Sequence, residues 1–357
     1  MNRKLALIVC TYQRAEALNR LLASVAVQSV YPDEILIIDG SLDEQTHDNL
    51  SQKSFKNLRY FKVEDIDRGL TRQRNYGIKR VKKDIDIVAF LDDDTILLEN
   101  YFEEILKTYK TYPQAIGVGG YITNEVKWRK ADIHKSEDLN NFYYDGYCRK
   151  ESSRFKLRRK LGLVQKSPPG FYPDFGHCRS IGFLPPSGKI YQTETLMGGV
   201  SSFPLSVLKE HKFSEYFEGY GLYEDADFSL RLSNQGNLYI NTAAQLEHHH
   251  DASGRPDMFR YGKMVIRNGW YVWRVKYPNP SLKARSKWNV IALLLTLIRF
   301  TNVITTVDKK GALIETVGRF IESIPTGFDT NKNYIGCQTV KYKEEKRASF
   351  ISYFFND

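Results

Sequence analysis

Three aspartates, Asp92, Asp93 and Asp94, directly follow the apolar run from Ile85 to Leu91. The run predicts a buried strand, so the three carboxylates would leave the sheet together at its C-terminal edge, where open α/β sheets bind their ligands. Neighbouring carboxylates repel one another unless a cation or strong hydrogen-bond donors offset their charge. This position favours a divalent metal ion that bridges a phosphate, whereas an acidic triplet in an ordinary turn would simply be solvated.

A second acidic group and a histidine run contain further residues that can do chemistry. The stretch from Tyr220 to Asp227 places three carboxylates at the start of a predicted helix, which is more than helix capping requires. A positioned carboxylate there can act as a general base. His248, His249 and His250 follow a predicted strand and make up three of the seven histidines. Because imidazole is a common metal ligand, this run together with the aspartates favours a metal site.

Polar residues that could contact a nucleotide follow the first two predicted strands. The sequence Cys10-Thr11-Tyr12-Gln13-Arg14 comes after the first strand, and Asp39-Gly40-Ser41 comes after the second. A carboxylate in this place accepts hydrogen bonds from an imide N–H group or a ribose hydroxyl group. The stretch Gly69 to Gly77 opens a helix whose N-terminus favours an anion, and its Arg74 can pair with a phosphate. Taken singly, these features are also typical of ordinary turns and of an exposed amphipathic helix.

The elements that position these residues alternate between strands and helices over the first 120 residues. The expected strands cover residues 4–10, 34–39, 58–63, 85–91 and 115–122, and the expected helices cover 14–28, 69–81 and 100–109. Further on, helices are expected at 204–210 and 224–234 and a strand at 238–246. This alternation predicts an α/β fold with a mixed, mainly parallel sheet and helices on both of its faces.

Two regions do not follow this alternation. Residues 123–195 contain a basic run at 149–160 and Pro/Gly-rich stretches, which is typical of a functional loop, a lid or a partly disordered segment. Beyond residue 255 the pattern is helical and rich in Trp, Tyr and Arg.

Composition excludes several classes of protein. Apolar residues make up 42% of the 357 residues, which is enough for a buried core and excludes global disorder. The four cysteines are scattered without paired spacing, which argues against a disulfide framework or a zinc site and favours a reducing, cytoplasmic compartment. No signal peptide is recognisable at the start of the sequence. No apolar stretch is expected to reach the roughly 18 residues that span a bilayer, since residues 290–298 end at Arg299.

The net charge of +10 is concentrated near the C-terminus: residues 251–357 contain 18 Lys and Arg against 9 Asp and Glu. This excess could face anionic lipid, nucleic acid, an anionic substrate or only water. The segment Ser286–Thr306 has a broad apolar face with Lys283, Arg285 and Lys287 beside it and Trp270, Trp273 and Trp288 nearby. These residues suit a peripheral contact with the inner face of a membrane, and equally a helix packed on the rest of the chain or in a homo-oligomer interface.

In their order, these features resemble the family-2, GT-A-type glycosyltransferases, which use nucleotide-diphosphate sugars. The matching pieces extend over about residues 4–250 and are Leu7 to Arg14, Glu34 to Ser41, Gly69 to Gly77, Phe90 to Asp94, Gly198-Gly199, Gly221 to Arg231 and His248. The resemblance implies a GT-A (Rossmann-like) catalytic domain at 1–254, followed by a mostly helical, basic region at 255–357. Within the domain it implies a nucleotide-sugar half (1–122), a variable insert (123–195) and an acceptor half (196–254).

The resemblance also implies a role for each matching residue. The residues implied to contact the nucleotide are Thr11, Tyr12, Arg14, Asp39, Arg74, Asp92 and Asp93. Asp94, Asp92 and His248 would hold Mn²⁺ or Mg²⁺, and Asp225, paired with Glu224, would be the catalytic base. Gly198, Gly199 and Tyr220 would face the acceptor. The implied reaction is an inverting transfer of a sugar to a hydroxyl group of a glycan or lipid-linked acceptor in cell-surface polysaccharide synthesis.

The chain departs from the family pattern in places, and three other classes of function can be compared with the sequence. Asp39 is a single acid where many members carry two, and Gln73 stands where a small residue is common, so donor and acceptor stay open. A phosphohydrolase with an aspartate nucleophile would need threonine at position 96, which is Ile96. A nucleotidyltransferase would carry a glycine-rich phosphate loop after the first strand, and none is present. A basic membrane- or nucleic-acid-binding protein on an inactive transferase scaffold would rest on the C-terminal charge alone, without a nucleic-acid motif.

Overall fold

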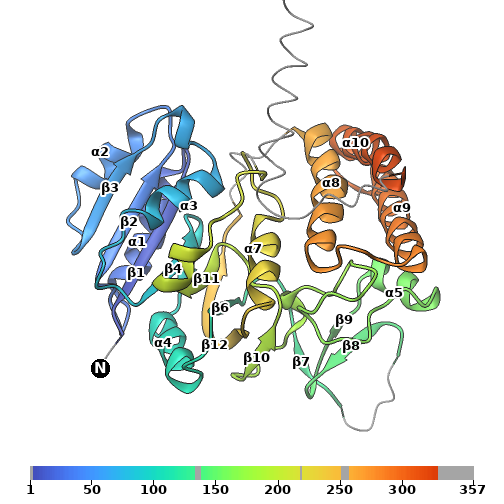
Figure 1. The fold of residues 1–357 in the computed structure, drawn as a ribbon, viewed down its shortest axis with the longest axis horizontal. Helices are drawn as coiled ribbons and strands as arrows, with labels where there is room; N and C mark the ends of the chain where they lie inside the picture. Colours follow the sequence, from blue (N-terminus) through green and yellow to red (C-terminus); the bar gives the residue numbers. More distant parts are fainter. Residues whose placement is uncertain (1–2, 133–137, 218, 251–256, 329–357) are drawn as a thin grey trace, which may run out of the picture.

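The computed structural model describes residues 3–132, 138–217, 219–250 and 257–328. Its centre is a nine-stranded sheet in the order β10-β12-β6-β11-β4-β1-β2-β3, with β5 paired to β12 (Figure 1). The strands of this sheet are β1 (Leu5–Thr11), β2 (Glu34–Asp39), β3 (Leu58–Lys62), β4 (Ile87–Asp92), β5 (Thr95–Leu97), β6 (Gly117–Ile122), β10 (Ile190–Thr193), β11 (Val200–Pro204) and β12 (Leu238–His248). β3, β2, β1 and β4 run parallel, β11 is antiparallel to β4 and β6, and β12 is parallel to β6. The expected mixed, mainly parallel sheet is confirmed.

The parallel pairing brings the polar ends of three strands to one edge of the sheet. β1 pairs with β2 so that Thr11 lies opposite Asp39, and with β4 so that Cys10 lies opposite Asp92. The three strands are apolar and buried along almost their whole length, as parallel strands between two helix layers must be. The polar residues that follow each strand therefore meet at the same edge.

Helices cover both faces of this sheet, as expected. They are α1 (Ala15–Ala26), α2 (Gln45–Ser51), α3 (Leu70–Ile78), α4 (Tyr101–Thr111), α6 (Leu205–Glu210) and α7 (Glu224–Ser233). On one face, Leu18 of α1 and Phe102 of α4 pack against Leu7 of β1. The next residue of that strand, Ile8, belongs to the core on the other face, together with Phe228 of α7. The two-residue period of the strands thus divides the apolar side chains between two cores.

The insert at 123–195 contains folded structure over its described residues. It forms a three-stranded antiparallel sheet in the order β7-β9-β8, made of β7 (Arg129–Lys130), β8 (Asn141–Tyr144) and β9 (Tyr147–Lys150). Helix α5 (Ser153–Lys160) and the short 3₁₀ helix η2 (Ile181–Phe183) follow before β10 joins the main sheet. Arg179 and Glu151 form a buried ion pair of 2.5 Å, and the guanidinium of Arg179 stacks on the ring of Phe155. This pair needs groups 28 residues apart in the sequence, which is why the local pattern did not indicate it.

Part of the basic run at 149–160 is structural. The guanidinium of Arg158 is buried and donates to the carbonyl oxygens of Leu163 and His177 at 3.0 and 2.7 Å. Arg149 donates to the carbonyl oxygen of Gly182 at 2.9 Å. These two arginines connect separate segments of the insert through hydrogen bonds. The basic run is therefore not wholly exposed to solvent.

The C-terminal region is helical, as expected, and consists of α8 (Met258–Lys276), α9 (Leu282–Thr305) and α10 (Lys309–Phe328). Trp270, Trp273 and Trp288 form its core with exposures of 2% or less, and their rings stack or meet edge to face. The expectation that these tryptophans suit a membrane interface is therefore wrong, because they pack α8 against α9. The part of the predicted 255–357 region beyond residue 328 lies outside the described residues.

Helix α9 also corrects the expectation that no stretch is long enough to span a bilayer. It has 24 residues with a mean hydropathy of 1.5 over its most apolar window, and only 22% of that window is buried. The charge of Arg299 interrupts the apolar run, but a helix tolerates one charge over this length. By length and composition alone α9 could cross a membrane, but one such helix is weak evidence of a membrane span.

Candidate functional site

The aspartate triplet lies at the C-terminal end of β4, where the apolar run placed it. Asp93 is 3% exposed and turns inward, because its carboxylate accepts a hydrogen bond of 2.7 Å from the hydroxyl group of Thr11 and lies 3.2 Å from Arg14 Nη1. Burial raises the pKa of Asp93 to about 7, although Thr11 and Arg14 lower it. The middle aspartate thus ties the end of β4 to the loop after β1. Asp92, in contrast, keeps 39% of its side chain exposed.

Asp92, Asp94 and His248 come together as a candidate metal centre. Each offers a ligand atom, and these atoms lie within 4.8 Å of one another. His248 Nε2 is 3.0 Å from Asp94 Oδ1. The antiparallel pairing of β12 with β5, with His248 opposite Thr95, brings the imidazole beside the aspartates from 154 residues away in the sequence. Two carboxylates and one imidazole are donors that suit Mn²⁺, so the predicted ligands fit a divalent cation.

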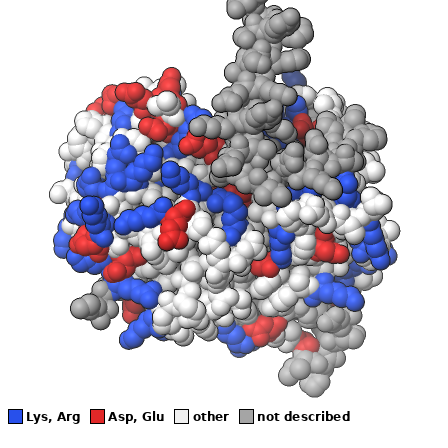
Figure 2. Space-filling view, viewed as in Figure 1, with Lys and Arg blue, Asp and Glu red and all other residues white. Residues whose placement is uncertain are grey.

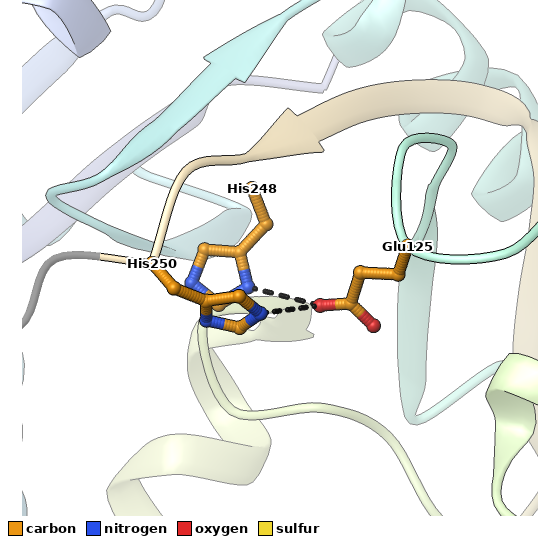
Figure 3. Close-up of side chains that lie close together, drawn as sticks. All are labelled: Glu125, His248 and His250. Carbon is orange, nitrogen blue, oxygen red and sulfur yellow. Dashed lines mark hydrogen bonds and ion pairs between the residues drawn. The ribbon is translucent and has the colours of Figure 1, made fainter. Parts of the chain in front are cut away.

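Glu125 is a member of this site that the sequence did not indicate. Its Oε1 atom lies 3.4 Å from His248 Nδ1 and 3.1 Å from His250 Nε2, so one carboxylate oxygen contacts both rings (Figure 3). Glu125, His248 and His250 also form a second group able to hold a metal ion. The parallel pairing of β6 with β12 places Ile122 opposite Leu246 and so brings the two following segments together. Both strands were predicted from the sequence. Their pairing at the same edge of the sheet is the feature that could have indicated Glu125 as a neighbour of His248.

The charge of His248 follows from these neighbours. Burial lowers the pKa of the imidazole, but the hydrogen bonds to Asp94 and Glu125 outweigh burial and raise it to about 10. The same contacts lower the pKa of Glu125. Without a bound cation, a protonated His248 therefore offsets the surrounding carboxylates.

Arg74 occupies a different place from the one expected of a phosphate ligand. It is 2% exposed and forms an ion pair with Glu224, while its Nη2 atom lies 3.7 Å from Asp92 Oδ1. The guanidinium also lies 5.2 Å from the centre of the Phe213 ring and 5.7 Å from that of Phe90. Burial raises the pKa of Glu224, and the charge of Arg74 opposes this rise. The pair joins α3 to the start of α7, and a role of Arg74 in nucleotide binding stays a prediction.

Asp225 lies at the start of α7 beside this ion pair. Its carboxylate accepts hydrogen bonds from the backbone N–H of Gly198 at 3.2 Å and of Ala226 at 2.7 Å. Tyr223, just before the helix, has a φ of 72°, and this left-handed turn directs the chain into α7. The side chain of Asp225 is half-buried, and burial raises its pKa. A carboxylate that is held in place and has a raised pKa is suited to accept a proton.

The two glycines expected at the acceptor lie instead against the charged groups. A Cβ atom at position 198 would overlap Glu224 and Arg74, and one at 199 would overlap the carboxylate of Asp92. Glycine at both positions is therefore required by close packing on the site. Contact with an acceptor at Gly198 and Gly199 stays a prediction.

The sequence of this part of the chain agrees with that of a known family. Residues 6–170 match the family model described as glycosyl transferase family 2. These residues belong to glycosyl transferase family 2. The match covers the strands and turns that carry Thr11, Asp39, Arg74 and the aspartate triplet.

Curated relatives of this family-2 region carry transferase names. The chain is 29% identical over 139 residues to glucosyl-dolichyl phosphate glucuronosyltransferase of Haloferax volcanii, which covers 38% of this chain and 43% of that protein. It is 27% identical over 117 residues to the O-antigen chain rhamnosyltransferase RfbN of Salmonella typhimurium, covering 33% and 36% of the two chains. The match thus spans less than half the length of either relative. Among solved structures, GalNAc-T7 with UDP, GalNAc and Mn²⁺ aligns with a TM-score of 0.49 and 15% identity over 74% of this chain and 47% of that chain.

In the family-2 region, Asp39 and Gln73 line the edge next to the aspartates. Asp39 is buried and accepts hydrogen bonds of 2.8 Å from the backbone N–H of Ser41 and from the hydroxyl group of Tyr60. Gln73 donates to the carbonyl oxygens of Thr11 and Ile38 at 3.1 and 2.8 Å, so it joins α3 to the ends of β1 and β2. The length of the Gln73 side chain allows both contacts.

The remaining predicted contacts lie at the surface of the family-2 region and beyond it. Tyr12 is half-buried, while Tyr220 is 38% exposed and meets Tyr261 of α8 edge to face at 6.2 Å. Lysine and arginine side chains form a band over the N-terminal half of the face shown in Figure 2, near α3. Such a band attracts anions, which fits an edge expected to receive a nucleotide.

Proposed function

We propose that this protein is a metal-dependent inverting glycosyltransferase, which moves a sugar from a nucleotide-diphosphate donor to a hydroxyl group of a glycan or lipid-linked acceptor. One observation carries the proposal: Asp92, Asp94 and His248 converge within 4.8 Å at the end of a family-2 strand. A binding protein on an inactive scaffold would not need this donor set beside a positioned carboxylate such as Asp225. A nucleotidyltransferase would also hold a metal ion, but it would carry a glycine-rich phosphate loop where this chain has Cys10 to Arg14.

Mn²⁺ or Mg²⁺ fits the donor set, and Asp92, Asp94 and His248 would hold it. When bound, such a cation offsets the negative charge that develops on the departing nucleotide diphosphate. The side chains of this protein supply the other requirements. Glu125 orients the imidazole of His248 from its far side, and the hydrogen bond from Thr11 to Asp93 fixes the turn that carries Asp92 and Asp94.

Asp225 would act as the base that accepts the proton of the acceptor hydroxyl group. Two backbone N–H groups fix its carboxylate, and burial raises its pKa, which makes it a stronger base. The oxygen of the acceptor would then attack the anomeric carbon from the face opposite the leaving group. This single displacement inverts the configuration of the sugar. Glu224 is engaged with Arg74, so it would position Asp225 and not itself take the proton.

Only the names of the relatives limit the choice of donor sugar and acceptor. Their names describe transfer to a dolichyl-phosphate glycolipid and to an O-antigen chain. We infer a comparable acceptor for this chain, a lipid-linked or polysaccharide glycan of the cell envelope, reached from the cytoplasmic side of the membrane.

Titration calorimetry with UDP, GDP and dTDP, each with and without Mn²⁺, tests the proposal. We expect the wild type to bind one nucleotide in the presence of Mn²⁺ and Asp94→Ala to lose about two orders of magnitude in affinity. Asp225→Asn should bind the nucleotide like the wild type but fail to transfer the sugar. Asp84→Ala, an exposed aspartate near the other end of β4, is the matched control and should change neither property. Failure of the wild type to bind any nucleoside diphosphate would refute the proposed function.

A further inference from the structure

The outer sides of α9 and α10 carry exposed apolar side chains that no other described part of the chain covers. On α9 they are Val290, Leu293, Leu297, Phe300 and Ile304, with exposures between 46% and 81%. On α10 they are Leu313, Val317, Phe320 and Ile321, with exposures between 40% and 47%. Their spacing of three and four residues places each set on one side of its helix. We call this surface the α9–α10 face.

The α9–α10 face is distinct from the side of α9 that packs into the core of the helical region. The opposite side of α9 is already buried, through Ala284, Trp288, Ile291, Ala292 and Thr296. The helix therefore has two apolar sides, one occupied by the tryptophan core and one open. Soluble monomers rarely expose so many large apolar side chains on two neighbouring helices without a use for them.

Charges are absent from the α9–α10 face itself. From residue 288 to residue 307 the sequence contains one charged residue, Arg299, and this side chain turns inward to Glu315 at 2.7 Å. Glu315 also pairs with Arg319 on α10 at 2.5 Å. One of these ion pairs thus joins the two helices and the other lies within α10, and neither involves the exposed apolar side chains of the face.

Basic side chains lie at both ends of the face. Lys283 lies at the start of α9, and Lys309 and Lys310 follow Asp308 at the turn into α10. Over residues 257–323 there are twelve Lys and Arg against four Asp and Glu.

All four acidic side chains are engaged within the helical region. Asp257 accepts a hydrogen bond from the backbone N–H of Arg260 and Asp308 one from that of Gly311. Glu315 is paired with Arg319 of α10, and Glu322 with Lys263 of α8. Basic side chains outnumber acidic ones by eight over residues 257–323, so the region around the face is positive.

This charge pattern selects among the possible occupants. The three- and four-residue spacing also suits packing against a helix of a second copy. A symmetric dimer, however, would bring the net positive charge of one copy against that of the other. A bilayer with anionic lipids offers an apolar interior to the face and negative head groups to its basic rim.

We propose that the α9–α10 face binds the surface of an anionic membrane, with the two helices lying in the interface and the lysines at the level of the head groups. The face stays attached to the protein, because α9 is bound on its other side to the tryptophan core. This contact goes beyond the proposed function and does not depend on it.

The contact would also set the orientation of the site. Asn268 of α8 donates a hydrogen bond of 2.9 Å to the carbonyl oxygen of Leu222, three residues before Asp225. Val272 of α8 packs with Phe217 and Leu230 in a shared core. The helical region is thus fixed to the segment that leads into α7. A docked face would hold Asp225 at a constant position relative to the bilayer, and only this consequence rests on the proposed function.

Flotation of the full chain with vesicles tests the contact. Vesicles of phosphatidylcholine with about one third phosphatidylglycerol should carry the wild type, and pure phosphatidylcholine vesicles should carry much less. The double variant Leu297→Glu and Phe300→Glu should bind at least about tenfold more weakly, since it places charges in the apolar layer. Lys309→Glu should lower binding about fivefold or more. Val27→Glu converts an equally exposed apolar residue at the end of α1 and should bind like the wild type.

A conservative variant guards against misfolding of the charged ones. Phe300→Trp places a fluorophore on the face, and its emission should shift to the blue only with anionic vesicles. An unshifted emission, or equal flotation of the double variant and the wild type, would overturn the proposal. Light scattering that shows a dimer broken by the double variant, without vesicle binding, would assign the face to a second copy. Asp94→Ala should lose nucleotide binding and still bind vesicles. That result would separate the membrane contact from the proposed function.

Discussion

Replacement of Gly199 by alanine should disable the metal centre with little effect on the fold. Gly199 precedes β11, and its carbonyl oxygen accepts a hydrogen bond of 3.1 Å from the backbone N–H of Asp92. An alanine Cβ would overlap the Asp92 carboxylate, whereas the backbone at 199 is not left-handed and accepts alanine without strain. The carboxylate is partly exposed and can turn away, so it would move by about 1 Å or more and leave its place as a ligand.

The size of the effect follows from this displacement. A misplacement of about 1 Å at a site costs roughly a hundredfold, so we expect Gly199→Ala to bind Mn²⁺ and the nucleotide about a hundredfold more weakly. The free energy of unfolding should fall by only about 1 kcal/mol, because the overlap is relieved by one side chain. Titration calorimetry measures the first quantity and denaturant unfolding the second. Gly182→Ala is the control, since its Cβ would meet Ser180 Oγ at an ordinary 3.6 Å. Unchanged Mn²⁺ affinity in Gly199→Ala would refute the assignment of Asp92 as a ligand.

Three further results are expected. Glu125→Gln should weaken Mn²⁺ binding about tenfold in calorimetry, because the Glu125 carboxylate orients His248. Glu247 contacts His249 instead, so Glu247→Gln should leave Mn²⁺ binding unchanged. Glu224→Gln should lower the free energy of unfolding by about 3 kcal/mol by leaving Arg74 buried without its partner, whereas Glu215→Gln removes an exposed pair with Arg72 and should cost under about 0.5 kcal/mol. The raised pKa of His248 stabilises the metal-free protein below pH 6.5 and loses that effect as the pH rises toward about 10. Its melting temperature should therefore fall over this range, and a melting profile of His248→Gln as steep as that of the wild type would contradict the assignment.

The sequence alone determined the order of most elements of the sheet and placed the acidic triplet at the end of β4. Apolar runs such as Ile85 to Leu91 are strong signals, because a strand buried on both faces must be apolar throughout. The strand at Glu34–Asp39 was predicted with its observed bounds. The strand β11 was not indicated, because Val200 to Pro204 is short and carries two buried serines. Ser202 is hydrogen-bonded to Val118 of β6 and Tyr109 of α4, and Ser201 donates to the carbonyl oxygen of Gly198.

Only the tertiary structure decided which charged residues are paired with one another. Arg74 and Glu224 are 150 residues apart, and Glu125 and His248 are 123 apart, so neither pair leaves a local pattern. The burial of the three tryptophans and the folding of the insert around Arg179 depend on contacts of the same kind. A residue's type shows what it can bind, but its burial and its partners are set by strands and helices that meet from distant parts of the chain. For that reason the sequence could indicate candidate metal ligands at strand ends, and only the fold could show that Arg74 is engaged with Glu224.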